Sequence, residues 1–338
     1  MGCWNWKNAG PVPRNRGLKG GPALMRITVA ICTRNRSRLL RQALEQMALA
    51  VPPPSVEHEV IVVNNNCSDD TDQVISSFAD RLPIRRVFEA RPGHSNARNA
   101  AVREARGEYI LWTDDDVLVD PRWIAAYVEA FARWPEGVVF GGPILPWFAA
   151  PPPLWLERTW PRVASVYATR DLGPDPIRFD GKKLVPYGAN FALRLVEQRL
   201  VSYDPRLGLR PGSELRGEET AVVAELLARG HQGWWIPGAS VRHFIPAERM
   251  TTRYLRNFFI GHGEHQVKTE HDDTIDGAGV TMLFGTPRWR WRHALAAEGR
   301  YRLSRFYAPP EIWVSHLITA STAWGRLRQM RRQQLHVA

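Results

Sequence analysis

Cysteine is scarce in this sequence: the 338 residues include only Cys3, Cys32 and Cys67. An odd number of scattered cysteines argues against a disulfide-stabilised secreted domain and favours a reducing compartment. Long apolar runs are also missing. No segment approaches the roughly 18 to 20 residues of a membrane-spanning helix, and residues 1–25 lack the apolar core of a secretory signal. We therefore predict a cytoplasmic protein.

Glycine-rich phosphate-binding loops are absent as well. No Gly-x-Gly-x-x-Gly follows the first strand pattern and no Gly-x-x-x-x-Gly-Lys occurs, which disfavours dinucleotide dehydrogenases and P-loop proteins. Acidic residues are fewer than basic ones, 34 against 45. The resulting net charge of +11 favours acidic partners: nucleotide diphosphates, nucleic acid or anionic lipid headgroups.

Short apolar runs alternate with amphipathic segments from residue 26 onward. Their spacing predicts strands at 26–32, 59–63, 84–88 and 108–112, separated by helices at 37–50, 71–79 and 93–106. This order builds a doubly wound, mostly parallel α/β sheet. Ligands of such sheets bind beyond the carboxyl ends of the strands, so the polar loops 33–36, 64–70 and 114–116 are expected to converge. Residues 1–25, rich in Gly, Pro, Asn and Arg, are predicted to be a disordered leader, with Met25 as a candidate start.

Three successive carboxylates, Asp114, Asp115 and Asp116, follow the fourth predicted strand. Adjacent acids repel one another, and a divalent cation that takes carboxylate and phosphate oxygens would neutralise them. The cluster therefore predicts a site for a metal ion and a diphosphate. The alternative is a solvated acidic turn in front of a helix that begins near Pro121.

The second half of the chain is less regular. Residues 143–160 combine proline and tryptophan without a period, which predicts an irregular segment packed over the sheet; stacking of tryptophan on a sugar is the alternative. Gly188 and Ala189 leave room for a substrate near the backbone, and Asn190 is a candidate hydrogen-bonding partner. A tight turn explains the same residues.

Two glutamates and a histidine complete the candidate chemistry. Glu218 and Glu219 open a predicted helix, whose dipole favours their ionised form; alternatively, one of them takes a proton from an incoming hydroxyl. His243 ends a short predicted strand and could complete a metal site begun by the aspartates, because imidazole suits ions like Mn²⁺.

Residues 264–338 carry no catalytic pattern. Arginines alternate with aromatic residues between 288 and 306, and residues 311–332 have the apolar spacing of a helix with a basic end. Peripheral contact with an anionic membrane, at its inner face, is the preferred interpretation; a solvated basic helix and nucleic-acid binding are the alternatives. A Gly261-His-Gly263 break is predicted to end the helix before this region.

Seven short motifs occur in a fixed order. They are Val-Ala-Ile-Cys-Thr-Arg-Asn-Arg at 29–36, Val-Ile-Val-Val-Asn-Asn-Asn-Cys-Ser-Asp-Asp-Thr at 60–71, Ala-Arg-Asn-Ala at 97–100, Glu-Tyr-Ile-Leu-Trp-Thr-Asp-Asp-Asp at 108–116, Gly-Ala-Asn-Phe-Ala-Leu-Arg at 188–194, Gly-Glu-Glu-Thr at 217–220 and Val-Arg-His-Phe at 241–244. With this set, the stretch 26–265 resembles the family 2 glycosyltransferases. The resemblance implies a GT-A fold, which is Rossmann-like and mostly parallel, with a nucleotide-binding half at 26–142, an acceptor half at 143–265 and a basic helical C-terminal extension at 266–338.

The resemblance also implies roles for individual residues. The nucleotide-sugar group comprises Thr33, Arg36, Asn64, Asn65, Arg98, Asp114 and Asp115, to which we add Asn190. Asp116, Asp114 and His243 would hold Mn²⁺ or Mg²⁺. Glu219 matches the catalytic base, and Glu218 remains the alternative because relatives commonly have Glu-Asp at this pair. Asn64 and Asn65 stand where an Asp is frequent in the family, so the identity of the nucleotide base stays open.

The implied reaction is an inverting transfer from a nucleotide-diphosphate sugar to a hydroxyl of a saccharide or lipid-linked glycan, in surface glycan or glycoconjugate synthesis. One rival is a sugar nucleotidyltransferase, which usually carries a Gly-rich, Arg-containing loop that residues 33–36 do not match. The other is a non-catalytic protein of the same fold that binds nucleic acid or a membrane surface. It is less favoured because the acidic positions of a transferase are all present.

Overall fold

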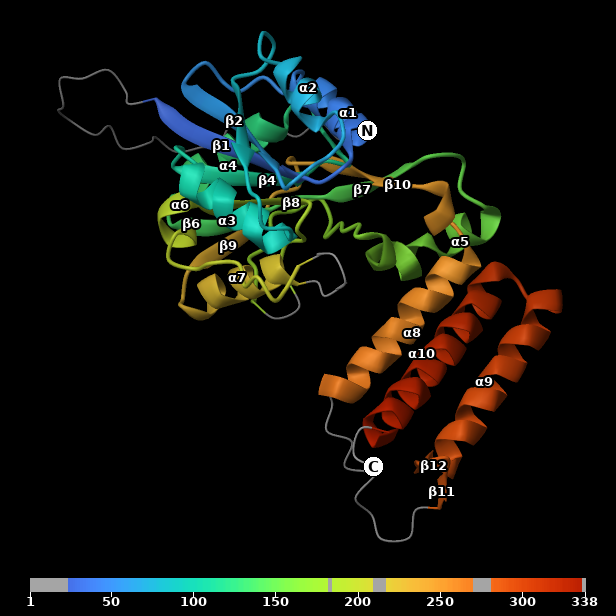
Figure 1. Ribbon diagram of the computed structural model, residues 1–338. Coiled ribbons are helices and arrows are strands. Elements are labelled where there is room, and N and C mark those ends of the chain that lie inside the picture. Colours follow the sequence, from blue (N-terminus) through green and yellow to red (C-terminus); the bar gives the residue numbers. More distant parts are fainter. Residues whose placement is uncertain (1–23, 182–183, 209–216, 270–280, 336–338) are drawn as a thin grey trace, which may run out of the picture.

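A seven-stranded sheet forms the centre of the molecule, with the strand order β3-β2-β1-β4-β8-β6-β9 (Figure 1). The computed structural model describes residues 24–181, 184–208, 217–269 and 281–335. The strands of the sheet are β1 (Met25–Thr33), β2 (Val56–Asn64), β3 (Ile84–Phe88), β4 (Tyr109–Asp114), β6 (Gly137–Gly141), β8 (Asn190–Arg194) and β9 (Gln232–Trp235). Only β8 runs antiparallel to its neighbours, β4 and β6. The predicted fold class, a mostly parallel α/β sheet, is confirmed.

Helices cover both faces of this sheet. One face packs against α1 (Ser37–Met47), α2 (Thr71–Ser76) and α4 (Trp123–Arg133), and the other against α3 (His94–Glu104) and α7 (Glu218–Ala228). Successive residues of a strand point to opposite faces, so Val29 joins the first core and Ala30 the second. Both faces are buried, which is why the strand sequences are almost continuously apolar.

A smaller sheet lies beside the carboxyl ends of the main strands. Its order is β5-β10-β7, formed by Val117–Val119, Val241–Ile245 and Ile144–Phe148. Strand β5 follows the aspartates directly and pairs antiparallel with β10, so that His243 lies opposite Val117. This pairing brings residues about 125 positions apart in sequence to one place.

The proline- and tryptophan-rich stretch 143–160 is more regular than predicted. It contains β7 and the helix α5 (Leu154–Val163), so the expectation of an irregular segment is wrong. Pro161 lies within that helix. Packing was the better interpretation, because Trp155 and Trp160 lie against a hydrophobic cluster shared with the C-terminal helices.

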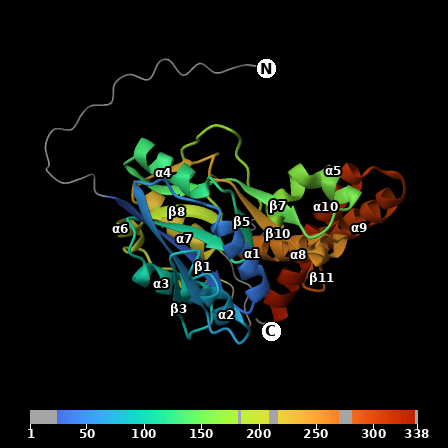
Figure 2. The same ribbon diagram turned by 90° about the horizontal axis from the view of Figure 1, so that it is seen from above.

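Three long helices extend from the small sheet, as Figures 1 and 2 show. They are α8 (Thr252–Thr269), α9 (Arg288–Tyr307) and α10 (Pro310–Leu335), and α10 contacts both of the others. Leu255, Tyr301 and Trp313, one from each helix, share a core with Ile245 of β10. In the described parts of the chain, no helix is long and apolar enough to cross a bilayer.

The helix break predicted at Gly261 and Gly263 is wrong, since α8 continues through both and past residue 265. Its glycines permit close helix packing. A Cβ atom at Gly263 would lie 2.2 Å from the carbonyl oxygen of Thr322 in α10, and one at Gly325 would lie 2.0 Å from that of Ile260 in α8.

The shorter elements complete the chain. They are α6 (Leu195–Gln198), the 3₁₀ helices Ala164–Tyr167 and Ala247–Arg249, and the hairpin of β11 (Met282–Leu283) and β12 (Thr286–Pro287). Residues 1–23, where the disordered leader was predicted, lie outside the described residues.

Candidate active site

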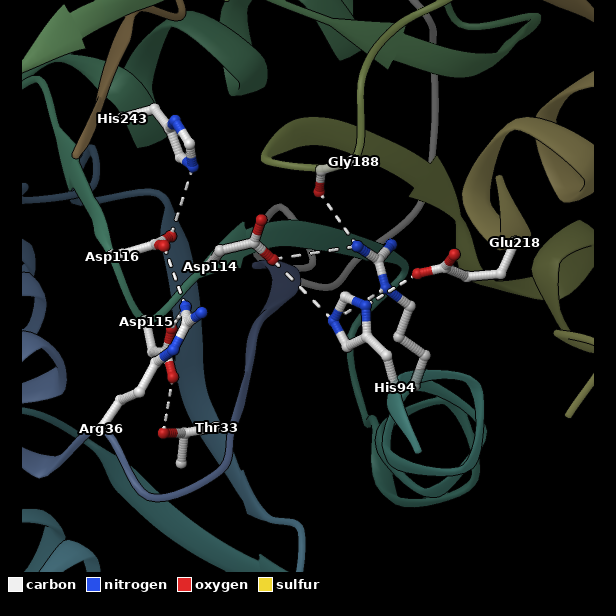
Figure 3. A network of polar contacts seen from close by, with 10 residues as sticks. Thr33, Arg36, His94, Asp114, Asp115, Asp116, Gly188, Glu218 and His243 are labelled. Atoms are coloured by element: carbon white, nitrogen blue, oxygen red, sulfur yellow. Dashed lines mark hydrogen bonds and ion pairs between the residues drawn. The ribbon is translucent and has the colours of Figure 1, made fainter. Parts of the chain in front are cut away.

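The three aspartates lie where β4 ends and β5 begins, next to the loop that follows β1 (Figure 3). The Thr33 hydroxyl donates to Asp115 Oδ2 at 2.7 Å. Arg36 Nη1 donates to Asp115 Oδ1 at 3.1 Å and to Asp116 Oδ2 at 2.9 Å. Strands β1 and β4 are neighbours in the sheet, which brings the predicted loops 33–36 and 114–116 together.

Burial raises the pKa of Asp114 and of Asp115 to about 7, although Arg98 and Arg36 respectively oppose the shift. The cluster therefore resists holding three full negative charges. Arg36 and Arg98 supply compensating positive charge.

His243 lies on the other side of this cluster. Its Nε2 atom is 3.6 Å from Asp116 Oδ1. Burial lowers the pKa of the imidazole, against the opposing effect of Asp116, so the ring is neutral at neutral pH and can act as a ligand. No cluster of three or more His, Cys, Asp or Glu side chains suited to a metal occurs in the ranges that the structure describes.

Arg98 occupies a buried position between the aspartates and the acceptor half, with 2% of its surface exposed. Its Nη2 atom donates to the carbonyl oxygen of Gly188 at 3.2 Å and lies 3.8 Å from Asp114 Oδ1. Three aromatic rings surround the guanidinium at 5.2 to 5.5 Å: Trp112, Phe191 and Tyr203. Burial opposes the charge of Arg98, but Tyr203 and the nearby carboxylates raise its pKa, so Arg98 remains a fixed positive charge.

His94, which the sequence patterns did not indicate, links the two halves of the site. Its Nδ1 atom is 2.7 Å from Glu218 Oε1, and its Nε2 atom is 4.0 Å from Asp114 Oδ1 (Figure 3). Arg98 Nε donates to His94 Nε2 at 3.4 Å, so Nδ1 carries the proton that Glu218 accepts. His94 follows Gly93 and lies four residues before Arg98, and residues four apart share a helix face. This spacing is the only feature of the sequence that could have indicated a role for His94.

The two glutamates differ in environment. Burial disfavours the charge of Glu218, but the hydrogen bond from His94 and the charge of Arg98 outweigh it and lower the pKa to about 2. Burial raises the pKa of Glu219, with Arg98 opposing the shift and Glu218 adding to it. A carboxylate with a raised pKa is the better proton acceptor, so the environments favour Glu219 as the base.

Gly188 borders this glutamate. A Cβ atom there would lie 3.0 Å from the Glu219 carboxyl group and 3.1 Å from Arg98 Nη2. Glycine at this position therefore keeps a side chain away from the Glu219 carboxyl group and Arg98, and the room for a substrate at Gly188 stays a prediction.

Asn64 and Asn65 are engaged within the protein. Asn65 donates to the carbonyl oxygens of Glu89 and Arg91 at 3.1 and 2.8 Å and accepts from the Gly93 amide at 2.8 Å. It thereby holds the loop that leads to His94. Asn64 donates to Asp72 and accepts from the backbone of Cys67.

Asn190 differs most from its predicted role. Its side chain is fully buried and makes four hydrogen bonds: Oδ1 accepts from Trp123 Nε1 and Tyr127 Oη, and Nδ2 donates to the carbonyl oxygens of Pro143 and Ala239. No hydrogen-bonding capacity of the amide remains for a sugar. The structure therefore corrects this prediction, and Asn190 ties α4 to the start of β8.

A cleft of about 540 Å³ adjoins the aspartates at Arg36. It lies between α1 and the outer face of the small sheet, where Arg38, Trp147 and Phe244 line it. Arg36 thus contacts both the carboxylates and an accessible cleft.

Comparison with known proteins agrees with this architecture. Residues 28–167 match the model of the family described as Glycosyl transferase family 2. The chain carries a glycosyl transferase family 2 domain. The GT-A fold is shared with the mannosyltransferase PcManGT from Pyrobaculum calidifontis, solved in complex with GDP-Man and Mn²⁺: the TM-score is 0.55 at 19% identity, covering 89% of this chain and 87% of that one.

Two curated relatives extend the comparison. It is 33% identical to validoxylamine A glucosyltransferase of Streptomyces hygroscopicus subsp. limoneus over 118 residues, which are 34% of this chain but only 26% of that protein. It is 24% identical to the succinoglycan biosynthesis protein ExoM of Rhizobium meliloti over 254 residues, 73% of this chain and 77% of that protein. The chain thus matches about a quarter of the first relative's length and most of the second's.

Proposed function

We propose that this chain is an inverting glycosyltransferase that moves a sugar from a nucleotide-diphosphate sugar to an acceptor hydroxyl, in surface glycan or glycoconjugate synthesis. The family 2 domain and the similarity to a glucosyltransferase and to a succinoglycan biosynthesis protein support this class. The observation that carries the proposal is the series of contacts from His243 through the aspartates and His94 to Glu218 (Figure 3). A metal-diphosphate site and a proton acceptor are both needed for the reaction, and this series joins the metal candidates to the start of α7, where Glu218 and the candidate base Glu219 are adjacent.

Asp116 and His243 are the proposed protein ligands of Mn²⁺ or Mg²⁺, with Asp114 beside them. Their 3.6 Å separation suits two ligands of one ion, whose metal–ligand bonds are about 2.0–2.2 Å. Such ions commonly take one or two carboxylates and complete their coordination with substrate phosphates and water, which suits a site with few protein ligands. When bound, the ion would stabilise negative charge on the leaving diphosphate.

Side chains of the protein would bind the donor and remove the proton of the acceptor. Thr33 and Arg36 would position the donor at the end of β1, and Arg98 would add a fixed positive charge beside Asp114. Glu219 would remove the proton of the acceptor hydroxyl as that oxygen attacks the sugar. Glu218, held by His94, would keep the helix start of α7 in place. In this proposal residues 26–142 serve the donor and residues 143–265 the acceptor.

The donor can be found with a panel of nucleotide-diphosphate sugars, each tested with Mn²⁺ or Mg²⁺. Thermal stabilisation and slow release of nucleotide diphosphate should single out one sugar nucleotide and should require the metal. If no donor is hydrolysed while oligonucleotides bind in a salt-sensitive manner, the protein is a binding protein instead.

Glu219→Gln tests the base once a donor is known. Transfer should fall about 10²- to 10⁴-fold while donor affinity is retained, because only the proton acceptor is lost. The matched variant Glu218→Gln should reduce stability more than the rate of transfer. Since the pKa of Glu219 is raised above its ordinary 4.5, the wild-type rate should decline as pH falls through that raised value. Unchanged transfer by Glu219→Gln would assign the base to Glu218.

A further inference from the structure

Helix α9 packs on α10 with one side only. The buried side consists mainly of small or hydrogen-bonded residues: Ala294, Ala297, Tyr301 and Ser304. The opposite side carries large apolar residues in the open: Leu295 is 59% exposed, Leu303 66% and Phe306 90%. A soluble helix normally shows the reverse arrangement at such positions.

These residues form one stripe with arginines among them. Residues three or four apart share a helix face, so Arg292, Leu295, Arg302, Leu303 and Phe306 lie along the same side. We call these five residues the α9 outer face. Tyr307, 79% exposed, adds an aromatic ring at its end.

The charge of α9 is strongly one-sided. The helix contains six arginines and a single acidic residue, Glu298. That glutamate is paired with Arg256 of α8 and Arg302. An anionic surface would complement this helix, whereas a basic surface would be repelled.

We propose that the α9 outer face lies on an anionic membrane surface, with its leucines and phenylalanine inserted at the level of the lipid headgroups. An interfacial helix combines apolar residues on one side with flanking basic residues, which attract anionic lipids. A second copy of the chain fits less well, because symmetric pairing would bring arginines against arginines. Nucleic acid fits less well because leucine side chains do not stack on bases. The proposal concerns attachment and does not depend on the identity of the sugar donor.

Binding to vesicles tests the proposal with the full chain. Phosphatidylcholine vesicles containing about one-third phosphatidylglycerol should co-sediment the protein, pure phosphatidylcholine should do so weakly, and high salt should weaken binding. The double variant Leu303→Ser/Phe306→Ser should bind anionic vesicles at least about tenfold more weakly, since each lost insertion removes apolar burial. Arg292→Gln should weaken binding and reduce its salt dependence.

Val196→Ser/Leu200→Ser is the matched control, because these residues are 67% and 65% exposed on and after the distant helix α6. It should bind like the wild type. All variants change exposed side chains, and an unchanged urea midpoint would confirm that they fold. Equal vesicle binding by the wild type and the α9 double variant would overturn the proposal. The proposal would also be overturned if the protein formed a dimer, or bound oligonucleotides but not vesicles, and the same double variant abolished that association.

Discussion

The buried amide of Asn190 provides a sharp test of how the site is supported. Tyr127→Phe removes one of the two donors to its Oδ1 atom and leaves the other, Trp123 Nε1, in place. The expected loss is about 0.5–1.5 kcal/mol in the free energy of unfolding, which is the net value of one hydrogen bond. The affinity for the nucleotide-sugar donor should not change, because all the hydrogen bonds of the Asn190 amide are made within the protein.

Asn190→Leu should cost far more at similar side-chain volume. It leaves three buried groups without a partner, namely the donors on Trp123 and Tyr127 and the carbonyl oxygen of Ala239, whereas the Pro143 carbonyl still accepts from the Val241 amide. At about 1–3 kcal/mol for each of the three unsatisfied groups, the loss should reach at least about 3 kcal/mol. In this background Tyr127→Phe should become stabilising, because it removes a hydroxyl that no longer has a partner.

Urea unfolding followed by far-UV circular dichroism measures each term of this double-mutant cycle. The matched control is Asn257→Leu, at an exposed position of α8, which should change stability by less than about 0.5 kcal/mol. An equal cost of Tyr127→Phe with and without Asn190 would refute the assigned hydrogen bonds. Reduced donor affinity in a fully folded Asn190→Leu protein would restore its predicted role in binding.

Three further predictions concern the metal site, the acid pair and the helix packing. Asp116→Ala should abolish Mn²⁺-dependent stabilisation by the donor in a thermal-shift assay; wild-type metal dependence would remove Asp116 from the proposed ligands. His94→Ala should cost about 1.5–3 kcal/mol at pH 7, because buried Glu218 loses its donor. Because the pKa of Glu218 is depressed in the folded protein, its ionised form stabilises the fold above about pH 4.5, and this contribution is lost as the pH falls toward about 2. The difference in the free energy of unfolding between His94→Ala and the wild type should therefore narrow over this pH range. Gly263→Ala should lower the melting temperature, because its Cβ atom would clash with α10. Gly261→Ala, which has open space around it, should raise the free energy of unfolding by about 0.5–1 kcal/mol. Equal effects of the two variants would contradict the close packing of α8 on α10.

The first half of the fold was predictable because its information is local. Periodic apolar residues depend on neighbours in sequence, and β1 to β4 follow them within a few residues. The parallel order then determines that the loops after β1 and β4 meet, which is why Thr33, Arg36 and the aspartates were found together.

Packing between segments that are distant in sequence was harder to predict. The glycines of α8 indicated a break because an isolated helix disfavours glycine, yet close contact with α10 makes the small residue favourable. The tryptophans of 143–160 had no readable period because their partners, such as Trp313, lie on another helix. His94 was missed for a related reason, since its partner Glu218 lies 124 residues away.

By itself, the sequence determined the α/β class, the succession of strands and helices up to the aspartates and the residue types available for chemistry, since these depend on local periodicity and composition. The tertiary structure alone decided which chemically similar residues differ in environment. It buried Asn190 among four partners, and it fixed Glu218 against His94 while raising the pKa of Glu219. Desolvation and hydrogen bonding are properties of the surroundings in space, and sequence neighbours such as Glu218 and Glu219 acquire different chemistry only when the chain is folded.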